Sequence, residues 1–308
     1  MYENRERKEF KLMCPERMDV AEPAVLDLAE AMRILGIKGW TLPNIRERFV
    51  ASYDPQRPEL GRAGKVTETD AEIVFDERFR TQELQAEYEA ELRAEGLDYP
   101  GMEQVYKHEL AHLAMWSVTG LRHQAAVRLI DEGWATIVER LGTDEALTVA
   151  ELVEGLKIKV KGLKEEEPEV YERCMDLEHP VSHLFPEDLG EAEYNVGAAL
   201  LLWIREMKGQ DAMIDLIRKA PTTSRRTSTE SDKIPANLMP DVHTGYEAYQ
   251  HGVVDPIRNE ELTPERMQQI SDFARKWEAA QFKTALLEVT EFESVAEARE
   301  EFELWLAN

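Results

Sequence analysis

The spacing of apolar side chains along the chain predicts a mostly helical fold. Between Glu22 and Leu35, apolar residues recur three or four positions apart, and Gly36 follows as a helix stop. The same period predicts later helices over Thr81 to Gly96, from Pro100 to about Val118, around Glu132, from Val149 to about Lys164, over Glu191 to Lys208, over Asp211 to Lys219 and from Thr263 onward. Capping boxes mark two helix starts, Thr148 to Glu151 and Ser294 to Glu297.

Two short segments have the composition of strands instead. Ile45 to Tyr53 and Ala71 to Phe75 contain β-branched and aromatic residues, and Pro, Gly and Asp bound them. Pro55 to Gly64, between these segments, is turn-rich and is predicted to be exposed. A small sheet among many helices places the chain in the α+β class, with helix predominant.

A change of composition predicts the domain organisation. Residues 221–240 are rich in Thr, Ser and Pro, which is typical of a linker. We therefore expect residues 1–80 to form an N-terminal helix and the small sheet, 81–220 a helical core, and 221–308 the linker and a C-terminal helical region.

Charge and length narrow the class of protein. With 308 residues, of which 43% are hydrophobic, the chain can bury a core. Its 37 basic and 62 acidic residues give a net charge of −25, which repels nucleic acid and anionic membranes, so neither is an expected partner. The charged start lacks the apolar segment of a secretion signal, and we expect a cytoplasmic protein. Cys14 and Cys174 are far apart and are expected to be free thiols.

The candidate chemistry lies in the segment His108-Glu109-Leu110-Ala111-His112. On a helix, residues four positions apart project from the same face, so both imidazoles can reach one metal ion with Glu109 beside them. The neighbouring residues are apolar, and buried titratable groups require a partner of this kind. A catalytic zinc ion takes three protein ligands and leaves its fourth position to water. The sequence therefore predicts one Zn²⁺ per chain.

The third ligand must come from elsewhere in the chain. Glu132 is the leading candidate, and His123 is the alternative. The compact three-histidine pattern is absent, because Met115 and Val118 stand where its glycine and third histidine would be.

The motif and the segment Glu132-Gly133-Trp134-Ala135, which follows after nineteen residues, together resemble the gluzincin zinc metallopeptidases, a group that includes thermolysin and the aminopeptidase N-like enzymes. The resemblance implies a small sheet before the zinc-binding helix, with an edge strand that packs on this helix and binds peptide substrate. A helical subdomain is expected to follow. Ala71 to Phe75 is the matching candidate for the edge strand.

Two features depart from the family pattern. Gluzincins often carry an Asp four residues after the ligand Glu, where it orients a ligand histidine, but this chain has Thr136. Asp131 is the candidate for that role through another geometry. The Gly-x-Met-Glu-Asn motif of aminopeptidase N-like enzymes is also absent, so the sequence supports no aminopeptidase assignment.

The resemblance also implies a mechanism. Zinc would activate water and polarise the peptide carbonyl, while Glu109, as general base, would carry the water proton to the leaving amine. The negatively charged carbonyl oxygen needs a further donor, which gluzincins supply as a Tyr or His from a later segment. Tyr194 stands at the matching distance. Its substitutes are His183, His243, Tyr246 and His251.

We thus expect a cytoplasmic single-zinc peptidase that acts on peptides or unfolded protein. The alternative is a zinc protein of the peptidase fold that serves as a regulatory or interaction module without turnover. A site for another metal is disfavoured, because two-histidine, one-carboxylate iron sites are not built on this helix motif. The sequence leaves open the choice between endo- and exo-action and the oligomeric state.

Overall fold

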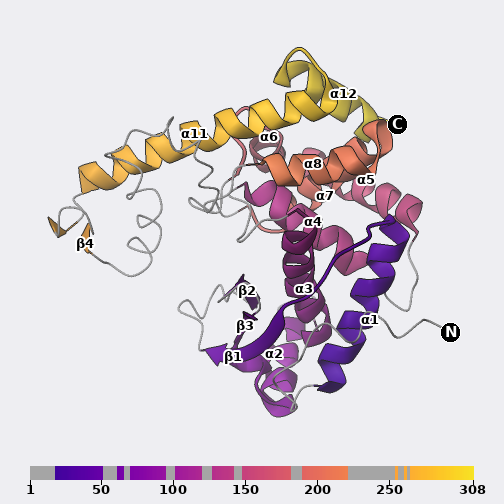
Figure 1. Cartoon of the computed structure of the whole chain (residues 1–308), viewed down its shortest axis with the longest axis vertical. Coiled ribbons are helices and arrows are strands. Elements are labelled where there is room, and N and C mark those ends of the chain that lie inside the picture. Colours follow the sequence, from indigo (N-terminus) through magenta and orange to yellow (C-terminus); the bar gives the residue numbers. More distant parts are fainter. Residues whose placement is uncertain are drawn as a thin grey trace. The chain divides into compact units, whose positions relative to one another are not determined.

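The structure is a computed structural model of the chain. It describes residues 18–50, 61–65, 70–94, 101–119, 127–141, 148–181, 189–220, 254–255, 260–261 and 264–308. Helices dominate these residues, and a small sheet accompanies them, which confirms the predicted α+β class (Figure 1). Contacts divide the chain into two compact units, Met1–Arg122 with Ala135–Leu152, and His123–Trp134 with Val153–Asn308. The predicted three-part division stays a prediction.

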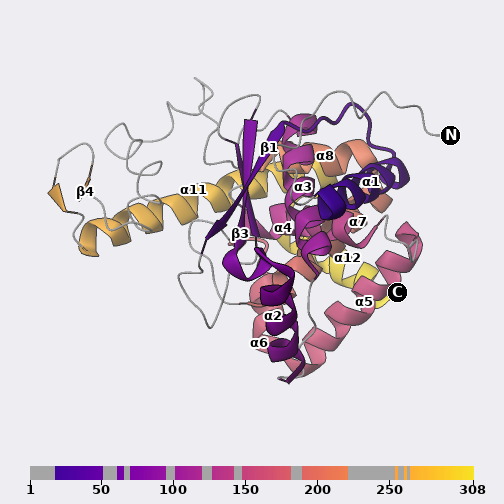
Figure 2. The same ribbon diagram turned by 90° about the horizontal axis from the view of Figure 1, so that it is seen from below.

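The first unit contains a sheet and the long helix that carries the histidine motif. Its elements are α1 (Met18–Leu35), β1 (Asn44–Val50), β2 (Gly61–Lys65), β3 (Asp70–Asp76), a 3₁₀ turn (Glu77–Phe79), α2 (Gln82–Ala94) and α3 (Met102–Thr119). Helix α3 contacts α1 on one side and β2 on the other (Figure 1). Figure 2 likewise shows α1 and the sheet on opposite sides of α3. Because it is covered on both sides, α3 is buried over most of its length.

The order of the described strands is β1-β3-β2, so β3 is the central strand of this sheet. It pairs in parallel with β1, where Ile45 lies opposite Ala71, and antiparallel with β2, where Gly61 lies opposite Phe75. The prediction that Ala71 to Phe75 forms the edge strand is therefore wrong. An edge strand does pack on α3, but it is β2, which begins within the segment predicted to be an exposed turn.

The position of β3 follows from its side chains. Ala71, Ile73 and Phe75 alternate along it and are fully buried. Such a strand buries the most apolar surface when it lies between two partners. Phe75 also stacks on Tyr106 of α3, with ring centroids 5.4 Å apart, which joins the sheet to the helix. By contrast, β2 has two glycines and no β-branched residue, so it carried no strand signal in the sequence.

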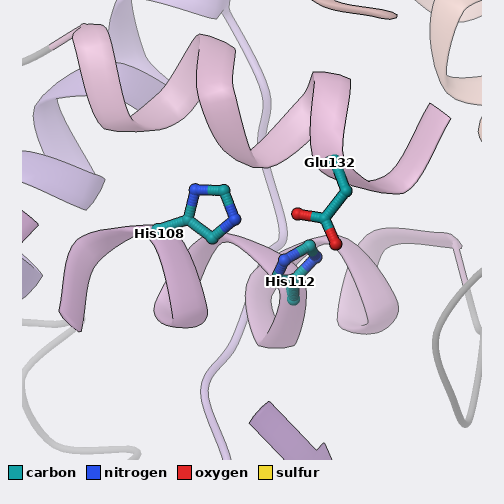
Figure 3. Close-up of side chains that lie close together, drawn as sticks. All are labelled: His108, His112 and Glu132. Atoms are coloured by element: carbon teal, nitrogen blue, oxygen red, sulfur yellow. The ribbon is translucent and has the colours of Figure 1, made fainter. Parts of the chain in front are cut away.

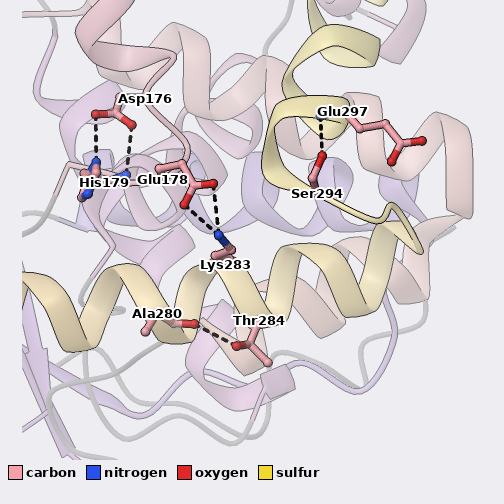
Figure 4. A network of polar contacts seen from close by, with 8 residues as sticks. All are labelled: Asp176, Glu178, His179, Ala280, Lys283, Thr284, Ser294 and Glu297. Carbon is pink, nitrogen blue, oxygen red and sulfur yellow. Dashed lines mark hydrogen bonds and ion pairs between the residues drawn. The ribbon is translucent and has the colours of Figure 1, made fainter.

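The second unit is helical and is built around α7. Its elements include α5 (Val149–Glu166), which begins at the edge of the first unit, α6 (Pro168–Cys174), α7 (Ala192–Lys208), α8 (Gln210–Lys219), α11 (Pro264–Thr290) and α12 (Val295–Ala307), with a short β4 (Val254–Asp255) and β5 (Glu260–Glu261). Helix α7 contacts α6, α8, α11 and α12, and nearly all of its first thirteen residues are buried. Lys283 of α11 pairs with Glu178 in the turn after α6 (Figure 4).

Local signals set the helix ends as predicted. At the end of α1, Gly36 has φ 74°, and the N–H of Ile37 donates to the carbonyl of Met32, which is the glycine-based helix stop. The capping box at Thr148 forms in both directions, since Glu151 N–H donates to its hydroxyl and Thr148 N–H donates to the Glu151 carboxylate.

The second capping box forms with a shift. The N–H of Glu297 donates to the Ser294 hydroxyl (Figure 4), while the Glu297 carboxylate accepts from the N–H of Glu293 and not from that of Ser294. The turn before it contains Glu291 at φ 63°, a conformation that favours glycine.

Helix α4 (Arg128–Arg140) crosses α7 at a point where both helices have glycine. A Cβ at Gly133 would lie 2.3 Å from the carbonyl carbon of Gly197, and a Cβ at Gly197 would lie 1.9 Å from the carbonyl oxygen of Leu129. These distances are far below van der Waals contact. The two backbones therefore touch directly, and only glycine fits at either position.

Among the described residues, no helix combines the length and the apolar character needed to cross a bilayer.

We predict that Gly197→Ala destabilises the second unit. The added methyl group would meet the Leu129 carbonyl, and overpacking of this kind costs about 1–3 kcal/mol or more. Gly155→Ala is the matched control, because a Cβ there meets nothing within 4 Å on α5 and alanine favours a helix. The free energy of unfolding in urea measures both variants. An equal or greater stability of Gly197→Ala would contradict the close crossing.

Candidate metal centre

Helix α3 presents two histidines one turn apart. His112 is buried and His108 is partly buried, and their ring centroids are 5.0 Å apart. The helix follows from its sequence, because Leu110, Ala111, Leu113, Ala114 and Met115 are strong helix formers that also fill the core. The helix thus places two imidazoles in an apolar surrounding.

The structure brings Glu132 to the two histidines. One ligand atom from each of His108, His112 and Glu132 lies within 4.8 Å of the other two. Figure 3 shows Glu132 extending from α4 toward His112, with His108 one turn away on α3. Within the described residues, this is the group of three that could hold a metal ion.

The boundary between the two units falls within α4, which is continuous across it. Glu132 and Glu139 therefore stand on one helix, seven residues and nearly two turns apart, and face the same side. Glu139 belongs to the first unit together with α3, and it contacts His108 of that helix.

Glu139 is a partner of His108 that the sequence reasoning missed. Its Oε2 lies 2.8 Å from His108 Nδ1, and its other oxygen accepts a hydrogen bond from Gln104. An ionised carboxylate can only accept, so His108 donates Nδ1–H, and Nε2 is the ring nitrogen suited to a metal. Burial tends to raise the pKa of Glu139, but the hydrogen bond and charge of His108 hold it below the usual value.

The carboxylate expected at position 136 is instead found one turn further on. Thr136 is buried on α4, and the carboxylate that reaches His108 is three residues later at Glu139. The signal was present in the sequence, because a residue seven positions after Glu132 returns to the same helix face. Asp131 is buried, and its proposed role stays a prediction.

The end of α4 is held against α3 by a buried cation. Lys107, beside the motif, donates to the carbonyl of Leu141 just past α4 and lies 3.8 Å from Asp27 of α1. Burial lowers the pKa of Lys107, and the Asp27 carboxylate opposes that shift. A cation at a helix C-terminus also interacts favourably with the helix dipole.

Glu109 lies under the start of the edge strand. It is buried, and a Cβ at Gly61 would be 3.0 Å from its Oε1 and 2.8 Å from Val105 Cγ1. The absence of a side chain at Gly61 therefore allows the β2 backbone to pass directly over this carboxylate. No sequence signal marked Gly61, because it lies in the segment predicted to be a turn.

Tyr194 stands at the start of α7, beside a cation that the sequence reasoning did not identify. Arg128 Nη2 donates to Tyr194 Oη at 3.0 Å, and the guanidinium lies 5.6 Å from the ring centroid. Burial, aided by the charge of Glu132, raises the pKa of Tyr194 well above its usual value, although Arg128 opposes the shift. The phenol therefore keeps its proton.

The alternative candidates lie outside the described residues. These are His123, His183, His243, Tyr246 and His251.

Comparisons of the chain with models of known protein families, with curated proteins and with solved structures found no match.

We predict that Glu139→Gln weakens zinc binding by roughly 10- to 100-fold, the usual cost of losing a carboxylate behind a histidine ligand. A neutral amide orients the His108 ring less well and makes Nε2 less basic. Competition against a chromophoric zinc chelator measures the affinity. Glu166→Gln, an exposed change on α5, is the control and should bind zinc as the natural chain does. If Glu139→Gln and Glu166→Gln bind zinc with equal affinity, Glu139 does not support the metal site.

Proposed function

We propose that this chain is a zinc-dependent metallopeptidase that hydrolyses peptide bonds with Glu109 as the general base. The observation that carries the proposal is the convergence of His108, His112 and Glu132, with the His108 ring oriented by Glu139. Two imidazoles and one carboxylate form a ligand set that suits catalytic zinc. The resemblance of the motif and its spacing to the gluzincins adds the reaction class.

The donor set fits a zinc ion for two reasons. The Nδ1–H of His108 is donated to Glu139, which is the arrangement that zinc-binding histidines commonly show. The site is also buried, where two imidazoles and a carboxylate are costly unless they are paired. Bound by these side chains, zinc would lower the pKa of water toward neutrality and polarise the scissile carbonyl.

The chain's own residues perform the proton transfers. Glu109 takes the proton of the attacking water and delivers it to the leaving amine, which requires a carboxylate rather than an amide. Tyr194 keeps its proton and donates a hydrogen bond to the carbonyl oxygen as negative charge develops there. The backbone of β2, at the edge of the described sheet, supplies groups with which an extended peptide can pair.

The proposed substrates are peptides or unfolded protein, because only an extended segment can lie along a strand edge. We place the activity in the cytoplasm. Cys174 is a buried free thiol, as is usual in a reducing compartment.

Glu109→Gln is expected to retain one zinc per chain and to lose roughly 10²- to 10⁴-fold in peptide cleavage, the usual contribution of a general base. Metal content is measured by elemental analysis and cleavage with a peptide library. A chelator should abolish cleavage by the natural chain, and added zinc should restore it. If the natural chain binds zinc but cleaves no peptide, the regulatory or interaction module is favoured. If Glu109→Gln keeps full activity, Glu109 is not the general base.

Gly61→Ala is expected to lower kcat by up to roughly 10²-fold, because the added methyl group would displace the Glu109 carboxylate or the strand above it. Zinc affinity should not change, since the atoms nearest to a Cβ at Gly61 belong to Val105 and Glu109 and not to the three predicted ligands. Gly101→Ala is the control, because a Cβ there meets nothing within 4 Å. Unchanged kcat in Gly61→Ala would show that the close approach of β2 has no catalytic role.

A further inference from the structure

A cation lies one helical turn before the third predicted ligand. Arg128 opens α4, and its Nε is 4.0 Å from Glu132 Oε1. Its Nη2 reaches two neighbours on α7, Tyr194 Oη at 3.0 Å and Glu193 Oε1 at 2.9 Å. The guanidinium thus links the helix of the candidate ligand to the start of the helix that carries the phenol.

The direction of the hydrogen bond between Arg128 and Tyr194 decides what the phenol can do. A guanidinium only donates, so it uses an acceptor lone pair of the phenolic oxygen and not the phenolic proton. The O–H is then directed to a different acceptor. A hydrogen bond received from a cation also polarises the O–H and makes it a stronger donor.

The surroundings of Arg128 fix its orientation. Nη2 faces two acceptors, because it donates to Tyr194 Oη and lies 2.9 Å from Glu193 Oε1. Glu193 is only 1% exposed, so its carboxylate needs this cation. The planar guanidinium cannot turn toward one acceptor without leaving the other.

The backbone supports the same arrangement. Gly133 follows Glu132 directly, and Gly197 lies three residues after Tyr194, so the close crossing of α4 and α7 is next to both groups. The crossing sets the distance between the helices beside Arg128 and Tyr194. The charge of Arg128 is already matched by Glu193 and Glu132, which leaves little attraction for a substrate carboxylate.

We propose that Arg128 is a positioning residue, which turns the Tyr194 hydroxyl so that its proton is donated to the carbonyl oxygen of a bound peptide. This role rests on the peptidase function proposed above. It assigns Arg128 an effect on kcat through Tyr194, with no contact to substrate.

The kinetic test is a double-mutant cycle. Arg128→Met alone would leave Glu193 buried without its cation, so all variants carry Glu193→Gln, and this single variant is the reference. We expect Tyr194→Phe to lower kcat by roughly 10²-fold, the usual cost of losing such a donor. Arg128→Met should lower kcat by roughly tenfold or more with KM unchanged. Their combination should be no worse than Tyr194→Phe alone.

Other kinetic results overturn the proposal. If the decrease in kcat of the combined variant equals the product of the two separate decreases, Arg128 acts independently of Tyr194. A rise in KM confined to peptides with a free C-terminal carboxylate, and absent for amidated peptides, would make Arg128 a substrate anchor instead. Arg128→Lys keeps the charge without the planar fork, so restoration of full kcat by lysine would show that charge alone suffices. Arg93→Met, an exposed change on α2, controls for loss of a surface cation.

A second readout does not depend on activity. Urea unfolding of the metal-free protein is measured for the same four variants. With Arg128 present, Tyr194→Phe should raise the unfolding constant about tenfold, the usual cost of losing a hydrogen bond to a charged group. With Met at position 128, the change should be less than about twofold. Equal changes in both backgrounds would overturn the proposal, because the pair would then be uncoupled.

The two readouts separate this inference from the proposed function. If the natural chain cleaves no peptide but the unfolding coupling is present, the peptidase function fails while Arg128 still orients Tyr194. If cleavage depends on Glu109 but the coupling is absent, the function stands and the positioning role is wrong.

Discussion

The burial of charge along one face of α4 is the constraint on which the rest of the structure depends. Arg128, Glu132 and Glu139 follow one another at intervals of four and seven residues, so each projects toward the same side. Charged groups removed from water are costly unless each meets a partner of suitable geometry. Helix α3 supplies partners at one end through His108, and α7 supplies them at the other. Each of these two helices therefore meets α4 through a polar contact.

The polar contact between α4 and α7 requires that these two helices approach each other closely. Side chains between α4 and α7 would hold the axes apart, and the hydrogen bond from Arg128 to Tyr194 would then be too long. Glycine at positions 133 and 197 removes that spacing. The same device recurs at Gly61, where a strand passes over Glu109. Glycine in regular structure costs about 0.5–1 kcal/mol in chain entropy, and here that cost permits contacts that a larger residue would prevent.

The sequence predicted what depends on local spacing and missed what depends on pairing between distant segments. The helices, their glycine stops and the grouping of His108 with His112 follow from the helical period. Glu139 was missed because the family pattern directed attention to position 136, although the helical period alone would have led to it. The order of the strands could not be found, because β2 lacks strand-forming side chains and owes its conformation to pairing with β3. Arg128 belongs to no recognisable sequence motif. Its contact with Tyr194 joins two helices whose residues are more than sixty positions apart in the chain.

The crossing of α4 and α7 has a consequence for how this sequence can change over evolutionary time. Most core positions tolerate drift, since a larger side chain in one place can be balanced by a smaller one opposite. At Gly133 and Gly197 no such exchange exists, because both residues already have the smallest possible side chain and each would collide with backbone. A substitution at either position could be accommodated only by moving a whole helix. These two positions are therefore expected to remain glycine, and the neighbouring side chains can vary only in ways that keep the short distance between α4 and α7.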